Sequence, residues 1–272
     1  MWDKLKTRLI SAVVLVAILL AAIFFTPGWV FALLVCALTF MVMYELTNVV
    51  GLKGKTAVVI TNYIFAAIFM FMCHFMHPMF YYPVIIVYCI ALSVICVLDN
   101  KRVKFTDVAT SVFMVIYSVV FLLHLVFIRR LDNGIAVLFM ALLGAYITDT
   151  GAYFTGMAIG KRKLIPAVSP NKTVEGAIGG VVSTLVCFLI YGGILTAIGY
   201  TINFLWIGVL AVICGVVAQF GDLTASVMKR SFAVKDFGNL IPGHGGMVDR
   251  VDSLMFVAPV VYYFITFLPV IK

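Results

Sequence analysis

Residues 134–157 read GIAVLFMALLGAYITDTGAYFTGM, and this stretch decides the fold class. Its one charged residue is Asp149, and a helix of this length can cross the apolar layer of a bilayer, which takes about 20 residues. Similar apolar runs recur along the chain, in which 64% of the residues are hydrophobic and 11% are charged. Soluble domains carry about 25% charged residues. The sequence therefore predicts an all-α polytopic integral membrane protein.

The apolar runs predict about nine transmembrane helices, separated by glycine, proline or charged residues. Residues 9–26 are expected to be a retained span, because no small-residue cleavage pattern accompanies them. Two regions are expected, residues 1–133 with about five spans and residues 134–272, where the polar motifs gather. The expected spans are residues 9–26, 29–50, 57–74, 81–98, 107–128, 134–157, 177–199, 204–224 and 254–271.

The distribution of positive charge predicts a cytoplasmic N-terminus, because short cytoplasmic loops are enriched in lysine and arginine. With these spans, all but three of the 19 lysines and arginines fall on the side of the N-terminus. The exceptions are Arg129, Arg130 and Lys272, and the Arg129–Arg130 pair is the one misfit with the rule. No basic face carries interleaved aromatic residues, so nucleic acid is not an expected partner.

Several residues are expected to be structural. The six cysteines stand singly in apolar runs and show no metal-ligand spacing, as expected of small residues inside a membrane protein. His74, His77 and His124 are placed within a span or near the non-cytoplasmic side. Glu45, near the cytoplasmic end of its span, is expected to be interfacial.

Charged and polar residues gather after residue 221. If the helix of span 204–224 continues beyond the membrane, Asp222, Ser226, Lys229 and Arg230 share one face, because they recur at spacings of three or four. An ionised aspartate near a membrane helix usually marks a site or pathway. One carboxylate with two cations on a face suits a metal-bound polyphosphate, although an interfacial acid paired with Lys229 is the alternative.

A glycine-rich turn follows, IPGHGG at residues 241–246, with His244, Gly245 and Gly246. Glycines let backbone N–H groups approach an anionic ligand closely, although most glycine-rich turns are only loops. Asp249, Arg250 and Asp252 come next, at the expected start of the last span. Capping of that helix is the alternative for Asp252, because acids are favoured at helix N-termini.

A second group of candidates precedes span 177–199. Asp149 stands among threonines and Gly151, and a hydrogen-bonded structural acid is the alternative there. The stretch SPNKTVEG, residues 169–176, resembles a helix start with a threonine close to Glu175. Lys172 at a helix start is electrostatically unfavourable unless an anion binds there, so it is a candidate phosphate ligand.

The stretch SVMKRSFAVKDFGNLIPGHGGMVDRVD, residues 226–252, resembles the signature of the phosphatidate cytidylyltransferases, or CDP-diacylglycerol synthases. TDTGAYFTGMAIGKRKL and SPNKTVEG are also similar to segments of that family. The resemblance covers about residues 145–255, and the first five spans are generic membrane helices. The signature positions are Ser226, Lys229, Arg230, Lys235, Asp236, Gly238, Pro242, His244, Gly245, Gly246, Asp249, Arg250 and Asp252.

The resemblance implies transfer of CMP from CTP to phosphatidic acid, which gives CDP-diacylglycerol and pyrophosphate and requires Mg²⁺. It implies a multi-pass protein of the bacterial cytoplasmic membrane, surrounded by membrane lipids, with the active site on the cytosolic side. A second cation and a homodimer are left open. Asp222 and Asp249 are the expected metal ligands, and with Lys229 and Arg250 the expected catalytic residues. The expected substrate-binding residues are Asp149, Lys172, Ser226, Arg230, Lys235, His244, Gly245 and Gly246.

Two other functions are weighed against this one. A CTP-dependent polyprenol or dolichol kinase would use a lipid alcohol and attack the γ-phosphorus, releasing CDP instead of pyrophosphate. A transporter or channel would need polar residues reachable from both faces and paired broken helices. The polar clusters of this sequence lie on one side, which favours the enzyme.

Overall fold

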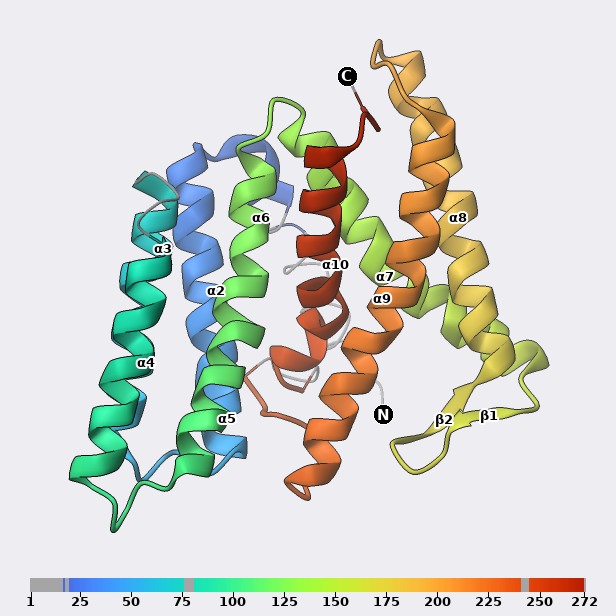
Figure 1. Ribbon diagram of the computed structural model, residues 1–272. Helices are drawn as coiled ribbons and strands as arrows, with labels where there is room; N and C mark the ends of the chain where they lie inside the picture. The colour runs from blue at the N-terminus through green and yellow to red at the C-terminus, as the bar shows by residue number, and fades with distance from the viewer. Residues whose placement is uncertain (1–16, 18–19, 76–80, 241–244, 272) are drawn as a thin grey trace. The chain divides into compact units, whose positions relative to one another are not determined.

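The computed structural model describes residues 17, 20–75, 81–240 and 245–271 (Figure 1). The first expected span, residues 9–26, lies largely outside the described residues, as do His77 and the proposed ligand His244. The elements in chain order are α2 (Gly28–Val49), α3 (Thr56–Phe75), α4 (Tyr81–Leu98), α5 (Phe105–Val115), η2 (Ile116–Val120), α6 (Phe121–Arg129), α7 (Gly134–Ile159), β1 (Lys163–Ile165), β2 (Ser169–Thr173), α8 (Val174–Ala197), α9 (Phe204–Ser231) and α10 (Val248–Phe267).

Eight helical segments within the described residues are long and apolar enough to cross a membrane. Helices α5 and α6 count as one of them, because the π-helical turn η2 joins them into a single span from Phe105 to Arg129. The prediction of an all-α polytopic membrane protein is confirmed, with one short antiparallel hairpin as its only described sheet. The side on which each loop lies stays a prediction.

The last two helices are longer than the hydropathy pattern indicates. Helix α9 continues to Ser231 instead of ending near residue 224, and α10 begins at Val248 instead of residue 254. Hydropathy marks only the apolar part of a helix, and lysine and arginine are good helix formers that extend α9 beyond it. The expected shared face of Asp222, Ser226 and Lys229 therefore lies on one continuous helix.

Contacts group the chain into two compact units, Met1–Val126 with Asp236–Val248, and Phe127–Lys235 with Asp249–Lys272. The division expected between residues 133 and 134 concerned function and stays a prediction. In the first unit, α3 packs against α2, α4 and α5, and the loops after α2 and α4 lie at the same end (Figure 1). Lys55 and Asp107 form an ion pair of 2.5 Å there.

Glu45 lies within this first unit, and its expected position at the membrane interface stays a prediction. Its side chain is buried inside the protein, at 1% exposure. One carboxylate oxygen, Oε2, accepts the backbone N–H of Val248 at 2.9 Å. Gly238 and Val248 both contact Glu45, which the local sequence of α2 could not indicate.

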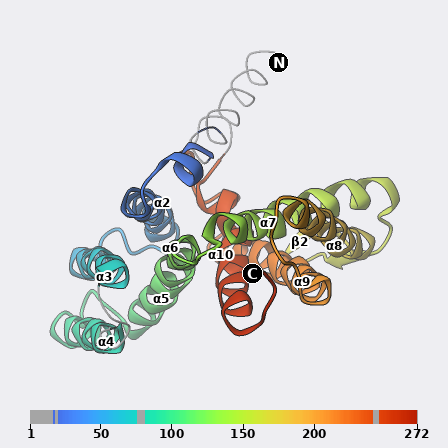
Figure 2. The same cartoon turned by 90° about the horizontal axis from the view of Figure 1, so that it is seen from above.

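In the second unit α7, α8 and α9 pack side by side, as both views show (Figures 1 and 2). Gly176 allows α7 and α8 to approach, because a Cβ atom there would meet the Ala152 carbonyl oxygen at 2.7 Å. The hydroxyl groups of Thr148 and Thr184 lie 2.6 Å apart between the same helices, and both residues are buried. Helices α7 and α8 are therefore in close contact where Ala152 and Gly176 line the proposed site.

The hairpin β1–β2 precedes α8 in this unit, with Lys163 paired to Thr173 and Ile165 to Ser169. Thr173 is the N-cap of α8, and its hydroxyl oxygen accepts the backbone N–H of Gly176 at 3.1 Å. The helix start expected near Glu175 is therefore present. Lys172 lies in the strand β2, one residue before the cap, so it approaches the site from the hairpin.

Candidate active site

A cavity of about 370 Å³ lies within the second unit, lined by the hairpin, the C-terminal part of α7, the start of α8 and the middle of α9. Helix α7 provides both an acid and apolar side chains, the hairpin provides a lysine, and α9 provides a second acid. The lining residues are Asp149, Ala152, Tyr153, Gly156, Met157, Leu164, Asn171, Lys172, Thr173, Gly176, Ala177, Gln219 and Asp222. The cavity is therefore lined by both polar and apolar side chains.

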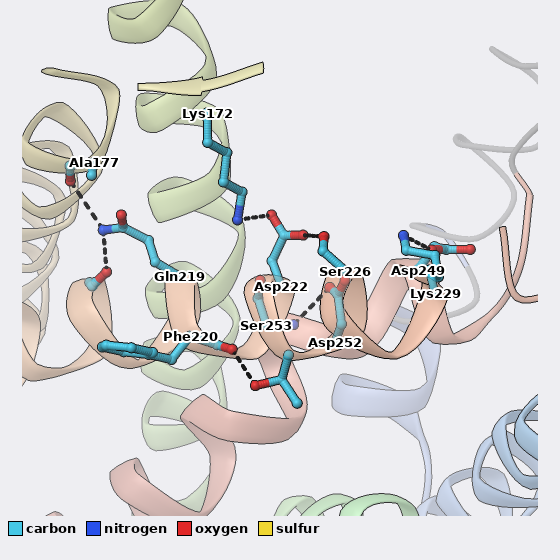
Figure 3. Close-up of polar contacts among 12 residues, drawn as sticks. Lys172, Ala177, Gln219, Phe220, Asp222, Ser226, Lys229, Asp249, Asp252 and Ser253 are labelled. Carbon is cyan, nitrogen blue, oxygen red and sulfur yellow. Dashed lines mark hydrogen bonds and ion pairs between the residues drawn. The ribbon is translucent and has the colours of Figure 1, made fainter. Parts of the chain in front are cut away.

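Asp222 and Lys172 meet across this cavity. The Lys172 ammonium lies 2.5 Å from Oδ2 of Asp222, and the two side chains are 25% and 31% exposed (Figure 3). One helical turn further along α9, the Ser226 hydroxyl donates a long hydrogen bond of 3.5 Å to Oδ1 of Asp222. The structure thus brings together three predicted site residues, from β2 and α9.

Asp149 and Asp252 extend the acidic group around Asp222. The carboxyl groups of Asp149, Asp222 and Asp252 are close enough for their charges to interact. Asp252 is 7% exposed and lies in the fifth position of α10, so it is not the cap that its sequence position suggested. Gly221 makes this approach possible, because a Cβ atom there would meet the Asp252 carbonyl oxygen at 2.6 Å.

Lys229 and Asp249 form a second ion pair, between α9 and the start of α10. The Lys229 ammonium lies 2.7 Å from Oδ1 of Asp249, and both side chains are largely buried, at 14% and 12% exposure (Figure 3). Asp249 lies in the first turn of α10, where the helix dipole also favours a carboxylate. Each of the two acids proposed to bind metal therefore has its own lysine.

The remaining predicted cations lie at the surface. Arg230 is exposed, and its Nε–H donates to the carbonyl oxygen of Val168 in the hairpin loop at 3.3 Å. Lys235 and Arg250 are exposed, and the Arg250 carbonyl oxygen accepts a hydrogen bond of 3.3 Å from the Tyr146 hydroxyl. Gly245 has a φ of +77°, which favours glycine, and Gly246 is buried. Substrate contacts by these residues stay predictions.

Gln219 is a lining residue that the sequence analysis did not single out. Its side-chain amide donates to the carbonyl oxygens of Ala177 at 3.1 Å and Gly215 at 2.8 Å, so it ties α9 to α8 beside the cavity (Figure 3). A signal was present, because an amide three residues before Asp222 in an apolar helix lies on nearly the same face. Tyr153 and Asn171 carried no comparable signal.

The acids present fit a hard divalent cation that arrives with a phosphate. Among the described residues, no three histidine, cysteine, aspartate or glutamate side chains converge closely enough to form a metal site alone. Mg²⁺ commonly takes one or two carboxylates and completes its shell with water and substrate phosphates. Asp222 and Asp249 each pair with a lysine, and Asp149 and Asp252 are two further carboxyl groups near Asp222, so oxygen ligands of the kind that Mg²⁺ takes are present.

The chain belongs to the cytidylyltransferase family, whose model matches residues 6–268. A protein of Bacillus subtilis (strain 168) named phosphatidate cytidylyltransferase is 40% identical over 168 residues, which cover 61% of each chain. A protein of Staphylococcus aureus (strain COL) with the same name is 41% identical over 164 residues, 60% of this chain and 61% of that one. The chain thus matches about 61% of the length of these relatives. The family resemblance seen in the motifs is confirmed.

Proposed function

We propose that this protein transfers CMP from CTP to phosphatidic acid, giving CDP-diacylglycerol and pyrophosphate. The observation that carries the proposal is the cavity in which Lys172, Asp149 and Asp222 meet, in a chain of the cytidylyltransferase family. The relatives' name, phosphatidate cytidylyltransferase, supports phosphatidate as the acceptor. The product would serve phospholipid biosynthesis.

The chemical problem is to bring two polyanions together. The second pKa of a phosphate monoester is about 6, so phosphatidate is largely dianionic at pH 7 and needs little help from a general base. Its phosphate oxygen attacks the α-phosphorus of CTP, the bond to the bridging oxygen breaks, and pyrophosphate leaves with that electron pair. Catalysis then depends on positioning and on neutralising charge.

The chain's cations would do this neutralising. Lys172 lines the cavity and would bind the CTP phosphates. Asp149 and Ser226 would be polar neighbours of the bound nucleotide. Lys229, Arg230, Lys235 and Arg250 would hold the remaining phosphate charge. His244, Gly245 and Gly246 would supply donors from the turn before α10.

Mg²⁺ is the proposed cofactor, with Asp222 and Asp249 as its protein ligands and a second cation left open. When bound, it would offset phosphate charge and polarise the phosphorus–oxygen bonds. The carboxyl groups of Asp149 and Asp252, which lie near Asp222, support this assignment. Release of Lys172 from Asp222 would at the same time free an ammonium group for a phosphate.

The apolar lining residues of the cavity suit the lipid substrate. Tyr153 and Met157 on α7 line the cavity and are exposed, 65% and 67% respectively, as expected of side chains that meet lipid. They would shelter the first part of the acyl chains. The positive charge bias supports a cytoplasmic (inner) membrane protein with this site on the cytosolic side. A homodimer stays open.

Purified protein in detergent, incubated with phosphatidate, Mg²⁺ and each nucleoside triphosphate in turn, tests the proposal. Formation of a liponucleotide and pyrophosphate with CTP or dCTP, and with neither ATP nor GTP, is the expected result. Release of CDP with a phosphorylated lipid alcohol would instead identify a lipid kinase. No liponucleotide with any nucleotide, from protein that remains folded, would overturn the proposal.

A further inference from the structure

Glu45 is a buried carboxylate in the apolar helix α2. Its side chain is 1% exposed, and its neighbours on α2, Met43 and Leu46, are fully buried apolar residues. Burial of a carboxylate is unfavourable unless it is hydrogen-bonded or paired. A glutamate at this position therefore needs a specific reason.

The reason lies in the segment that leads into α10. Oε2 of Glu45 accepts the backbone N–H of Val248, the first residue of α10, at 2.9 Å. The first N–H groups of a helix have no partner within the helix, and a carboxylate there is also favoured by the helix dipole. Glu45 thus satisfies one such donor from a helix distant in sequence.

The other carboxylate oxygen touches the opposite end of the same segment. A Cβ atom on Gly238 would lie 2.6 Å from Oε1 of Glu45 and 2.9 Å from its Cδ. A side chain at residue 238 would therefore force the Glu45 side chain to shift, because the backbone of Gly238 packs directly on the carboxylate. Among the described residues no group donates a hydrogen bond to Oε1, so packing holds this oxygen.

We propose that Glu45 is a positioning residue, which holds both ends of the segment Gly238–Val248 and thereby fixes where α10 begins. Val248 is followed directly by Asp249, whose carboxylate binds Lys229 at 2.7 Å, and by Arg250. A shift of Val248 would therefore disturb the adjacent Asp249 and its ion pair with Lys229. The catalytic part of this inference rests on the proposed function, whereas the anchoring of the segment does not.

The anchoring is tested by hydrogen–deuterium exchange on the full-length protein in detergent. Glu45→Ala removes the acceptor, and the amide of Val248 should exchange at least ten-fold faster, whereas peptides of α3 and α8 should be unchanged. Glu45→Gln keeps an oxygen acceptor of the same reach and should restore most of the protection. Thr39→Val is the matched control, because Thr39 is buried on the same helix and its hydroxyl donates to the Val35 carbonyl oxygen of that helix.

The positioning role is tested by CDP-diacylglycerol formation with the same variants. Glu45→Ala should lower kcat/KM for CTP at least ten-fold, Glu45→Gln should lie within a few-fold of wild type, and Thr39→Val should match it. Gly238→Ala should also be impaired, because its Cβ atom collides with Glu45. The double variant should be no worse than Glu45→Ala alone, since the truncated side chain leaves room for the new methyl group.

The outcomes separate the two proposals. If wild-type protein forms no liponucleotide, the proposed function fails, and the exchange experiment still decides whether Glu45 anchors the segment. Unchanged exchange at Val248 in Glu45→Ala would overturn the anchor. Fast exchange with unchanged kcat/KM would overturn the positioning role, and so would a Glu45→Gln variant as impaired as Glu45→Ala.

Discussion

At the residue scale, each acid proposed to bind metal near α9 is neutralised by a neighbouring lysine. Asp222 pairs with Lys172 and Asp249 pairs with Lys229, so the two carboxylates proposed to bind Mg²⁺ are each compensated by a lysine in this structure. The ion pair of Lys172 and Asp222 is partly exposed, so it can open when substrate arrives. Asp222 would then bind the metal ion and Lys172 a phosphate. The more buried pair of Lys229 and Asp249 should be harder to open.

The first prediction concerns the proposed metal ligands. Asp222→Asn and Asp249→Asn keep the size of the side chain and lose the charge that Mg²⁺ requires. Each should reduce CDP-diacylglycerol formation more than ten-fold, and each should weaken the stabilisation of the protein by Mg²⁺ in thermal unfolding. Asp252→Asn, a neighbour outside the proposed metal pair, should reduce activity less.

Radiolabelled CTP incorporation and a thermal melt with and without Mg²⁺ provide the measurements, and the exposed Asp132→Asn is the control. If Asp222→Asn keeps more than a tenth of wild-type activity, less than about 1.4 kcal/mol of barrier is involved. That is too little for a direct metal ligand, and the assignment would be wrong.

The second prediction concerns Lys172. Lys172→Ala should raise KM for CTP or lower kcat/KM about ten-fold or more, because an ammonium group is removed from the cavity wall. Folding should be preserved, since the side chain is 25% exposed. Lys163→Ala, an exposed lysine on the neighbouring strand, is the matched control and should have little effect. If the two variants have equal kinetic constants, Lys172 does not bind CTP and its role is structural.

At the element scale, the approach of α9 to α10 decides whether the acids can interact. Gly221 lies against the backbone of Asp252, and Gly208, on the same helix, has only Leu185 Cδ1 at 3.7 Å from a Cβ position. Both glycines are inside α9, where alanine would be favoured by about 1 kcal/mol of helix propensity. The two positions therefore separate helix propensity from helix packing.

The third prediction uses this contrast. Gly221→Ala should destabilise the protein by about 1–3 kcal/mol, because its methyl group must push α10 away, and it should lower activity. Gly208→Ala should be neutral or slightly stabilising. Thermal unfolding in detergent and the CTP assay measure both effects. A Gly221→Ala protein as stable and active as Gly208→Ala would show that α9 and α10 do not need this close contact.

At the scale of the whole molecule, access to CTP depends on the side to which the polar loops are exposed. The fourth prediction tests the orientation given by the lysines and arginines. In a background without the six native cysteines, a membrane-impermeant maleimide added to intact cells should label Thr201→Cys, in the turn between α8 and α9. It should not label Asn239→Cys, between α9 and α10. Both positions are exposed. The reverse pattern would overturn the orientation and, with it, access to cytosolic CTP.

The sequence by itself determined the membrane class, nearly all of the described spans and the family. Hydropathy reports how each segment partitions into a membrane, and this depends on composition alone. It also determined which residues share a face within one helix, as for Asp222 and Ser226, because side chains four positions apart project from nearly the same side of an α-helix. The signature from Ser226 to Asp252 was readable because its residues are close in sequence.

Only the tertiary structure decided which of these residues meet. Lys172 reaches Asp222 because a short hairpin places it beside α9, Asp149 joins the same acidic group from α7, and Glu45 binds Val248 across 203 positions of sequence. Local pattern carries no information on such partners. They are set by how closely whole helices approach, and that depends on small residues and packing at contacts far apart in the chain, such as Gly176 with Ala152 and Gly221 with Asp252.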